Sequence, residues 1–495
     1  MRRIYLLHFV LAIALLFTFG GAAQSLAADH QVQGMDSLEE VLRDVQLLHI
    51  SDPDSQTLIK GAIDGLLKTL NDPYTSYMTP EELRELRNSI DGRYMGIGVQ
   101  MQPGEIYPKV LNTIENTPAS KAGIMPGDRI IKIDGTDISH EPLGKIVERI
   151  RGPEETKLTL TIRREGNYDF NVVLTRANIS NPTVTGKILD DGIGYIHINM
   201  FGDFTGDEFA KTLNDLQGQG AAKLILDLRD NPGGIIHSAL SVSSNFIEQG
   251  KVVLSTFDRR GNREEYLAEW SSDSIDDMPI VVLVNEYSAS AAELVAGALQ
   301  DYGRATLIGG QTFGKGTVQA VIPLETGGAL KITVARYHTP RGRAIDGTGL
   351  SPDIQVLTPG LSLAVAYAYL NGNSGNTIIF DGDKNEIMVN GVTIRNERVI
   401  QLQGKTYLPL RLLFEFLGYR VDWLPDERAV KAAKFQSEAF FYPGDGYYIV
   451  NGQTYPVAAA VLSIEGHLYI QDSLATLFNA GVRHMGSTVI IEKGL

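Results

Sequence analysis

Residues 280–293 read IVVLVNEYSASAAE, an apolar run that passes directly into small residues and a glutamate. An uninterrupted apolar run of this length, bounded by turn residues, is typical of a strand buried on both faces. The segment after it predicts a helix that begins near Ser290. A serine there lies at the positive end of the helix dipole, which favours a developing anion. We therefore consider Ser290 a candidate nucleophile, although serine is also a common N-cap residue.

Strand and helix patterns alternate on both sides of this stretch, across residues 192–358. Residues 224–228 have a second buried-strand pattern, and residues 235–249 follow it with a helical one. This alternation predicts βαβ units and therefore an α/β core with a largely parallel sheet. Ligands bind such sheets at the carboxyl ends of the strands. Gly233 and Gly234 lie at that end, where their amides suit an oxyanion hole or, alternatively, a tight turn.

A lysine enclosed by glycines comes after the helix that begins at Ser290. Lys315 lies between Gly314 and Gly316. If it is buried, desolvation lowers its proton affinity, which makes it a candidate general base; if the loop is open, it is simply an exposed lysine. Residues 309–315 also match the first part of a phosphate-binding loop. That motif needs Ser or Thr where Gly316 stands, and a helix where the pattern predicts a strand, so nucleotide binding is disfavoured.

A histidine-based triad is the alternative catalytic arrangement. His237 follows the paired glycines and Asp227 is near it in sequence, but Ser290 lacks the Gly-x-Ser-x-Gly elbow. No His-Glu-x-x-His motif or comparable cluster of ligands occurs in the sequence. We therefore predict no metal site and no cofactor.

Length, charge and composition bound the remaining choices. A chain of 495 residues predicts about three domains. The formal net charge of −15 disfavours nucleic acid as a partner, because phosphate binding needs clustered Lys and Arg. There is no cysteine, which excludes disulfides, thiol nucleophiles and thiolate metal sites.

The N-terminus has the pattern of an export signal. Arg2 and Arg3 precede an apolar stretch over residues 4–19, and Ser25 to Ala27 supply small residues for a cleavage site. We assign residues 1–27 to a signal peptide; the alternative is an uncleaved N-terminal anchor, since the apolar stretch approaches spanning length. Either way the body of the protein is expected outside the cytoplasm, in the cell envelope or secreted.

The rest of the chain divides by pattern into further parts. Helical spacing comes first, then short strands separated by Gly and Asp turns, then the α/β core. After a stretch rich in Gly and Asn, Val389–Gly391 recurs as Val450–Gly452, which indicates a duplicated unit. We assign residues 28–90 to a helical, dimerising segment, 91–177 to a β-rich domain, 178–360 to the α/β core, 361–376 to a linker and 377–495 to a duplicated α+β module.

Taken together, the motifs resemble the carboxy-terminal processing, or tail-specific, serine peptidases. The resemblance covers about residues 35–358. It implies a serine endopeptidase with a Ser-Lys dyad and an acyl-enzyme intermediate: Ser290 as nucleophile, Lys315 as general base, and Gln319 to orient the lysine. It also implies oxyanion donors at Ala291 and at either Gly233 or Gly234. The blocks that carry it are Asn71–Thr75, Asp227–Gly234, Ser288–Glu293, Tyr302–Ala305, Thr312–Thr317 and Gly349–Asp353.

The β-rich domain resembles a PDZ domain. The stretch from Tyr94 to Gly98 resembles the loop whose amides bind a chain-terminal carboxylate, and the strand from Val99 would pair with the peptide. This resemblance implies substrates with free apolar C-termini. The predicted peptide-binding residues are Met95, Gly96, Ile97, Gly98 and Val99.

Residues 377–495 resemble the copper amine oxidase N-terminal-like module of exported proteins, for which we expect a cell-envelope contact and no copper. A non-catalytic PDZ scaffold or adaptor of the envelope is the competing function. The combination of Ser290, Lys315, Gln319 and the paired glycines favours the enzyme, because a scaffold has no use for it. A homodimer is also expected.

Overall fold

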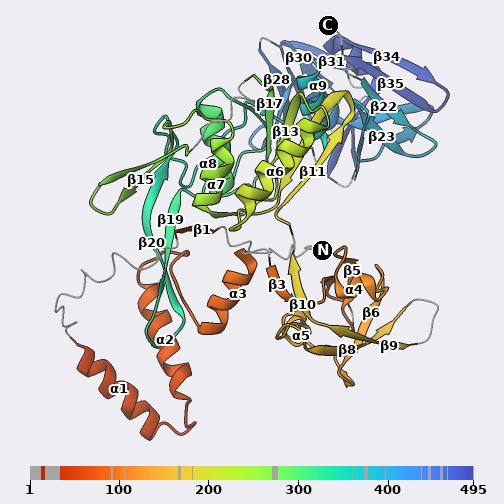
Figure 1. Ribbon diagram of the computed structural model, residues 1–495. Helices are drawn as coiled ribbons and strands as arrows, with labels where there is room; N and C mark the ends of the chain where they lie inside the picture. Colours follow the sequence, from red (N-terminus) through yellow and green to blue (C-terminus); the bar gives the residue numbers. More distant parts are fainter. Residues whose placement is uncertain are drawn as a thin grey trace.

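The structure is a computed structural model. It describes residues 13–16 and 34–493, except 91–92, 105, 165–168, 181, 270–276, 359, 373–376, 396, 436, 444–446, 457–460 and 465. Most of the predicted signal segment, residues 1–27, thus lies outside the described residues. Helices and several separate sheets make up a multidomain chain (Figure 1). Within the described residues, no helix has the length and apolar character needed to cross a membrane.

The α/β core is built on a six-stranded sheet. Its order is β11 (Val184–Leu189), β12 (Ile193–Ile198), β13 (Lys223–Asp227), β17 (Ile280–Val284), β18 (Thr306–Gly309) and β21 (Ile354–Gln355). The pairs from β12 to β21 are parallel, and β11 is antiparallel to β12. Every residue of β17 is buried, as a strand covered on both faces requires.

The two faces of this sheet have different cover. Leu226 and Val282 point to one face and share a hydrophobic cluster with three helices. Ile225 and Val281 point to the other face and share a cluster that continues into the C-terminal module. The covering helices are α6 (Thr205–Gly218), α7 (Ile236–Ser244) and α8 (Ala291–Asp301) on the first face, and α9 (Leu361–Leu370) on the second.

Helix α9 corrects the assignment of residues 361–376 to a linker. Residues 361–370 form a helix with six buried residues, packed against the core sheet. Only residues 371–376 have the Gly, Asn and Ser composition on which the linker prediction rested. The helix was missed because it is apolar on all sides, so it lacks the amphipathic period by which helices are recognised.

A second sheet packs beside the core. Its order is β14 (Gly233–Ile235), β1 (Ile13–Leu16), β19 (Thr317–Pro323), β20 (Ala329–His338), β15 (Val252–Asp258) and β16 (Arg263–Leu267), and β2 (Ser76–Met78) pairs with β20. Strand β1 comes from the predicted signal segment. It runs parallel to both neighbours, with Ile13 opposite Gly233 and Leu15 opposite Gln319.

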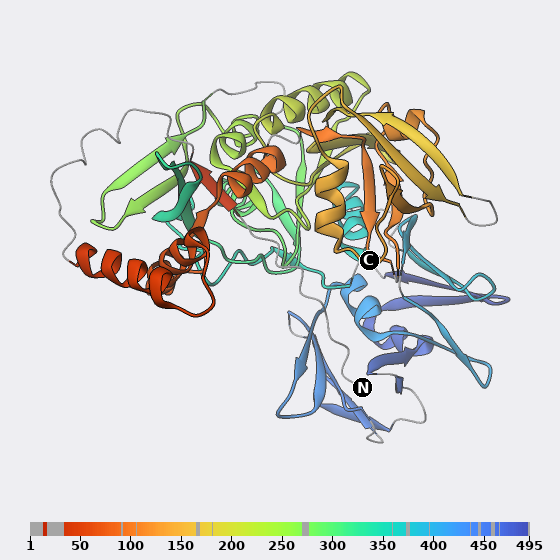
Figure 2. The ribbon, with the colours of Figure 1, turned by 90° about the horizontal axis from the view of Figure 1, so that it is seen from below.

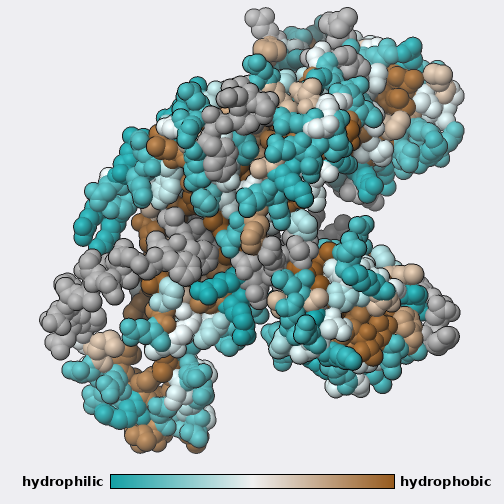
Figure 3. All heavy atoms as spheres, in the orientation of Figure 1, coloured by the Kyte–Doolittle hydropathy of each residue, from teal (hydrophilic) through white to brown (hydrophobic). Residues whose placement is uncertain are grey.

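The N-terminal segment is helical and extends away from the core in Figure 1. It contains α1 (Met35–Leu48), α2 (Ser55–Lys68) and α3 (Pro80–Ile90). Helix α3 begins with a capping box, since the Thr79 amide donates to Glu82 and the Glu82 amide donates back to the Thr79 hydroxyl. Helix α1 buries none of its residues. Brown apolar atoms are visible over these helices in Figure 3.

The β-rich domain has its own hydrophobic core. Strand β3 (Arg93–Gly96) pairs with β10 (Ala177–Ser180), and these two strands connect the domain to the rest of the chain (Figure 1). The main sheet contains β4 (Val99–Gln102), β5 (Lys109–Thr113), β6 (Arg129–Ile133), β8 (Lys157–Arg163) and β9 (Phe170–Thr175), with β7 (Thr136–Asp137) beside β6. The helices are α4 (Pro118–Lys121) and α5 (Leu143–Ile150).

The C-terminal module consists of three small sheets around α10 (Leu410–Phe416) (Figure 2). Its two recurring Asn-Gly turns have the same local structure. Asn390 and Asn451 both have positive φ, and each side chain accepts an amide hydrogen from the neighbouring strand. The strands are β22 (Thr377–Asp381), β23 (Glu386–Val389), β24 (Val392–Ile394), β25 (Ile400–Leu402), β26 (Lys405–Pro409), β27 (Arg420–Leu424), β28 (Ala429–Lys434), β29 (Ser437–Phe441), β30 (Tyr447–Val450), β31 (Gln453–Pro456), β32 (Val461–Ile464), β33 (His467–Gln471), β34 (Ala480–Met485) and β35 (Thr488–Lys493).

Candidate active site

Ser290 lies where β17 passes into α8. The turn between them is fixed by Ser288, whose hydroxyl donates to the Leu228 carbonyl at 2.8 Å and accepts from the Asn285 amide at 2.9 Å. Ser290 is the N-cap of α8, with φ 56° and ψ −115°. A left-handed φ is uncommon for a residue other than glycine and is costly enough to be kept mainly at functional positions.

The Ser290 hydroxyl is buried and unsatisfied. The residue is 0% exposed, and within the described part of the chain its Oγ has no hydrogen-bond partner. A buried hydroxyl without a partner is unfavourable, because it has lost its bonds to water. The Ser290 hydroxyl can therefore form a hydrogen bond to a reacting group that enters the site.

The paired glycines pack directly against the Ser290 turn. Gly233 has φ 98°, and a Cβ atom on it would lie 2.7 Å from Ser290 Cβ and 2.9 Å from the Ala291 nitrogen. A Cβ on Gly234 would lie 2.0 Å from the Phe201 carbonyl oxygen. The Gly233 amide donates to Asn231 Oδ1 at 2.8 Å. Both positions therefore require glycine, and the close approach brings their backbone beside the Ala291 amide.

Lys315 is buried in the loop before β19, as a general base requires. Its side chain is 1% exposed. Burial is the largest effect and lowers the pKa of Lys315 to about 7; the charge of Lys331 lowers it further, while Asp72 and Glu293 raise it. A lysine with that pKa is substantially neutral at physiological pH.

Glu293 links the serine loop to the lysine loop, and sequence reasoning assigned it no role. Its Oε2 accepts the backbone amides of Ser290 at 2.8 Å and Lys315 at 2.9 Å. Its Oε1 accepts the Gly314 amide at 2.7 Å and the Thr312 hydroxyl at 2.5 Å. The side chain is 0% exposed, and desolvation raises the pKa of Glu293 although these hydrogen bonds oppose the shift. The sequence pattern identifies Glu293 as a capping-box residue of the helix. No sequence pattern predicts its hydrogen bonds to the lysine loop.

Two tyrosines complete the surroundings, also without a prediction from the sequence. The buried Tyr337 hydroxyl donates to the carbonyls of Ser290 at 3.0 Å and Lys315 at 2.8 Å. The ring of Tyr74 lies over Lys315 Nζ, with 4.5 Å to the ring centroid. Tyr74 belongs to the Asn71–Thr75 block, so that block supplies one wall of the lysine pocket.

Gln319 is the third predicted catalytic residue, and it is the third residue of β19. Its Nε2 donates to the hydroxyls of Thr317 at 3.0 Å and Thr333 at 3.1 Å. These bonds orient the amide so that Oε1 is the acceptor left over. Oε1 is buried and has no hydrogen-bond partner among the described residues.

The alternative sites are not assembled. His237 is exposed on α7, and its Nδ1 lies 3.5 Å from Glu269. The Asp227 carboxylate is bound by Arg229 and by the Tyr195 hydroxyl, which excludes a triad built on His237 and Asp227. Lys315 is followed by strand β19 and not by a helix, so the phosphate-loop pattern fails as expected.

The predicted peptide-binding loop lines a cavity of about 170 Å³ between β4 and α5. Gly96, Ile97, Gly98 and Val99 border it; Met95 does not, and it pairs instead with Asn178. Gly98 has φ 78°, and a Cβ there would lie 2.3 Å from Thr117. The remaining lining residues, missed from sequence, are Met101, Val147, Ile150 and Arg151.

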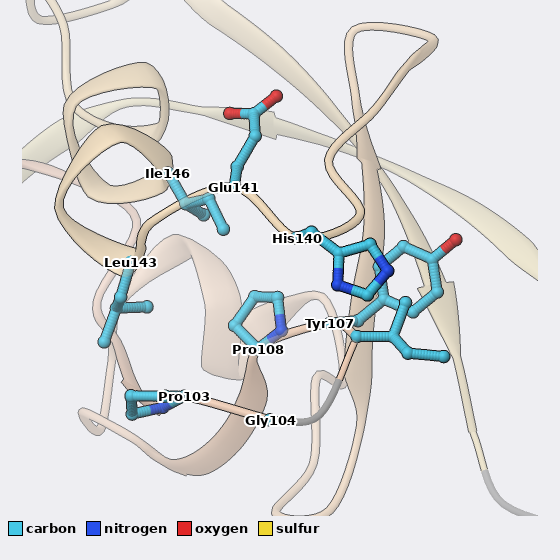
Figure 4. A pocket seen from close by; sticks show the side chains of 9 residues that line it. Pro103, Gly104, Tyr107, Pro108, His140, Glu141, Leu143 and Ile146 are labelled. Carbon is cyan, nitrogen blue, oxygen red and sulfur yellow. The ribbon is translucent and has the colours of Figure 1, made fainter.

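A separate cavity of about 210 Å³ in the same domain is shown in Figure 4. Tyr107, Pro108, His140 and Leu143 border it. None of the predicted peptide-binding residues lines this cavity. Of these two cavities, the one beside Gly96–Val99 is therefore the one that the predicted peptide-binding residues line.

Comparisons with known proteins identify four segments of the chain. The sequence profile of peptidase family S41 matches residues 192–356, and that of the PDZ domain matches residues 110–164. The profile of the activating protease CtpB N-terminal domain matches residues 21–82. The profile of the copper amine oxidase N-terminal domain matches residues 388–491.

Curated relatives cover most of the chain. It is 40% identical over 345 residues to the carboxy-terminal-processing protease of Bartonella bacilliformis, which spans 68% of this chain and 79% of that one. It is 36% identical over 356 residues to a probable CtpA-like serine protease of Staphylococcus aureus, with 71% and 70% covered. Among solved structures, the photosystem II D1 C-terminal processing protease is 31% identical over 65% of this chain and 87% of that one, with a TM-score of 0.41. On the match to its curated relatives and to the family profile, the chain belongs to the carboxy-terminal-processing proteases of peptidase family S41 and is a serine peptidase.

Proposed function

We propose that this chain is an exported endopeptidase in which Ser290 is the nucleophile and Lys315 is its general base. The observation that carries the proposal is the single oxygen Glu293 Oε2, which accepts the backbone amides of both residues. This oxygen keeps the two loops adjacent around a buried lysine whose pKa lies near 7. Base-assisted attack requires a neutral amine and a serine hydroxyl on adjacent segments, and the shared carboxylate oxygen places the backbones of both residues there.

The proposed reaction has two half-reactions. Lys315 accepts the Ser290 proton as Oγ attacks the scissile carbonyl, and the resulting ammonium returns the proton to the leaving amine, which gives an acyl-enzyme. Water, deprotonated by the same lysine, then attacks the acyl carbonyl, and the lysine returns the proton to Ser290 Oγ as the acyl–oxygen bond breaks and the acid product leaves. The amide of Ala291 would stabilise the oxyanion together with that of Gly234, because the Gly233 amide is already bound to Asn231.

Gln319 is assigned to holding the lysine during this cycle. Because its Nε2 is bound by two threonines, Oε1 is left as an acceptor for an N–H of Lys315. That bond would point the amine lone pair away from Gln319 and toward Ser290. The proposed role is positional, and Gln319→Leu should lower kcat more than it raises KM.

The PDZ domain is proposed to select substrates with a free apolar C-terminus. The loop at Gly96–Val99 offers amides to a carboxylate, and Val147 and Ile150 give the cavity an apolar wall. Arg151 lines the same cavity and adds positive charge for the terminal carboxylate. The scissile segment would then bind as a strand between β14 and β19, where β1 pairs with both.

The decisive experiment measures cleavage of an unstructured peptide by Ser290→Ala, Lys315→Ala and His237→Ala variants. The first two should lose activity by several orders of magnitude, as do other covalent catalytic units, while His237→Ala should retain it. The pH profile of the parent should show one limb near pH 7, with activity rising as Lys315 loses its proton. Full activity in Ser290→Ala would reject the dyad, and parent protein that binds peptides without cleaving them would favour the scaffold.

A homodimer through the N-terminal helices is also proposed. Helix α1 leaves Leu38, Val41 and Leu48 exposed on one face, at 46%, 60% and 80%. An apolar helix face is costly in water, and a second copy of the same face is the simplest self-complementary cover. Val41→Glu with Leu48→Glu should convert a dimer to a monomer in sedimentation velocity, and an unchanged mass would reject this interface.

The C-terminal module is proposed to contact the cell envelope from a fixed position on the peptidase. Its residues share a hydrophobic cluster with Val281 and Leu283 of β17. It is therefore part of the same packed body and not a tethered tail. Deleting residues 377–495 should lower both the solubility of the peptidase and its retention in an envelope fraction; loss of solubility alone would leave the module a structural role only.

A further inference from the structure

Lys331 is a second lysine buried next to the proposed catalytic centre, and the mechanism above does not use it. It lies on β20, 5% exposed, opposite Val321 of β19 and Ser76 of β2. Burying an ammonium group is expensive, so lysines are almost never buried without a compensating partner. We therefore ask which neighbouring groups compensate the buried charge of Lys331.

Strand geometry places Lys331 on the catalytic face of its sheet. Side chains two residues apart on a strand point to the same face, so Lys331 and Thr333 lie on one side of β20. Thr333 is opposite Gln319, and their side chains are hydrogen bonded at 3.1 Å. Lys331 is therefore on the face that carries Gln319.

Asp72 connects this face to the lysine pocket. Thr75 Oγ1 accepts the Thr333 amide at 3.1 Å and donates to Asp72 Oδ2 at 2.5 Å. Burial lowers the pKa of Lys315 and of Lys331, and the Asp72 carboxylate opposes the shift in both by favouring their charged forms. Lys331 is thus the cation that can offset Asp72 without being the base.

Titratable side chains from three parts of the chain act on Lys315. The segment before β2 contributes Asp72 and Tyr74, and β20 contributes Lys331 and Tyr337. Helix α8 contributes Glu293, whose two oxygens are already occupied by hydrogen bonds. Of these groups, Lys331 is the one whose charge repels a proton on Lys315.

We propose that Lys331 is a positioning residue that acts through Lys315: from the face of β20 that carries Thr333, its charge balances Asp72 and favours the unprotonated Lys315 amine, which can accept the Ser290 proton. This inference rests on the proposed function and adds the residue that sets the working pH of the base. Without Lys331, Asp72 would face Lys315 alone and hold it as an ammonium ion, which cannot act as a base.

The test compares the pH profiles of kcat/KM for the parent, Lys331→Met and Lys331→Arg in the full chain. Each profile is divided by its own plateau at about pH 9.5, so that a smaller folded fraction cancels. Lys331→Met should move the acidic limb up by about one pH unit, which is about a fivefold relative loss at neutrality. Lys331→Arg keeps the charge and should leave the limb in place. Lys211→Met, at an exposed position on α6, is the matched control for loss of one lysine.

Asp72→Asn should shift the acidic limb of the pH profile in the opposite direction. Removing the carboxylate should move the limb to lower pH, because Lys315 loses a stabilising anion. If Lys331→Met lowers the rate equally at every pH, or leaves the limb in place, Lys331 has only a packing role and the inference is wrong. Lys331→Gln, also normalised to its plateau, decides the matter if the Met variant does not fold. Failure of the dyad itself would be recognised separately, by activity persisting in Lys315→Ala.

Discussion

The ring of Tyr74 lies 4.5 Å from the ammonium nitrogen of Lys315, measured to the ring centroid. The two residues are far apart in sequence, and the contact closes the lysine pocket from the side of the N-terminal segment. An aromatic ring here has two opposing effects. Its bulk excludes water and disfavours the ammonium ion, whereas its face attracts a cation.

The first prediction separates these effects of Tyr74. Because burial is the largest influence on the lysine, Tyr74→Ala should admit water, raise the pKa of Lys315 and move the acidic limb of kcat/KM to higher pH. Tyr74→Phe keeps the ring and should leave the limb unchanged. The measurement is the pH profile on an unstructured peptide. A limb that moves to lower pH in Tyr74→Ala would mean that the attraction of the ring face dominates.

The second prediction concerns stability. The folded-state pKa of Lys315 is lowered to about 7, far below the value in an unfolded chain, so between those values the unfolded state binds the additional proton. Folding stability therefore rises with pH across this window, and the penalty is full below about pH 7. Lys315→Met should raise the free energy of unfolding by a few kcal/mol near neutrality and by much less at about pH 10.

The control for that comparison is Lys211→Met, in which an exposed lysine on α6 is lost. Its difference from the parent should be small at both pH values. The measurement is thermal unfolding of the full chain at the two pH values. An equal gain for Lys315→Met at both would attribute the effect to packing and not to proton linkage.

The third prediction addresses Glu293. Glu293→Gln replaces one carboxylate oxygen by an amide NH₂. That group cannot accept hydrogen bonds, so the two N–H groups bound to the oxygen it replaces would lose their acceptor. The serine and lysine loops should separate, and kcat/KM should fall by about 100-fold or more, since small displacements at an active site are costly. Gln300→Ala, at the far end of α8, is the matched control and should retain activity. Parental activity in Glu293→Gln would show that the loops are held by other contacts.

The fourth prediction concerns recognition of chain ends. A peptide with an apolar C-terminal residue should bind the full-length Ser290→Ala variant about tenfold more tightly as the free acid than as the amide, a difference of about 1.4 kcal/mol. Replacing its last residue by aspartate should also weaken binding, because Val147 and Ile150 line the cavity. The measurement is fluorescence anisotropy. Equal affinities for acid and amide would leave the PDZ domain as a lid or spacer.

The sequence was sufficient for the parts of the site that are local. Ser290 follows an apolar strand and is the N-cap of a helix, so its place between the two elements and at the positive end of the helix dipole could be predicted. Lys315 could be recognised from its glycines, but its burial could not, because the ring of Tyr74 that lies over it comes from a distant segment. Glu293 was visible only as a helix-capping residue. Its bonds to the lysine loop depend on how two loops meet, which no local pattern encodes.

The errors in the fold have equally physical causes. Helix α9 was assigned to a linker because the residues after it are rich in Gly and Asn and because a helix that is apolar on all sides has no polar face. The hairpin of β19 and β20 joins strands that are close in sequence, but its other partners β1, β15 and β2 come from separate parts of the chain. Pairing between distant strands is set by tertiary packing, so it leaves little trace in any one stretch of sequence.

The position of β1 between β14 and β19 has a consequence for selectivity. Each of those strands presents a backbone edge toward the gap, and a chain that enters it is held by main-chain groups that all residues share. Main-chain pairing of this kind places few demands on the side chains of the strand that occupies the position. If the proposed substrate strand binds there, its sequence preference has to come from other contacts, such as those proposed for the PDZ domain.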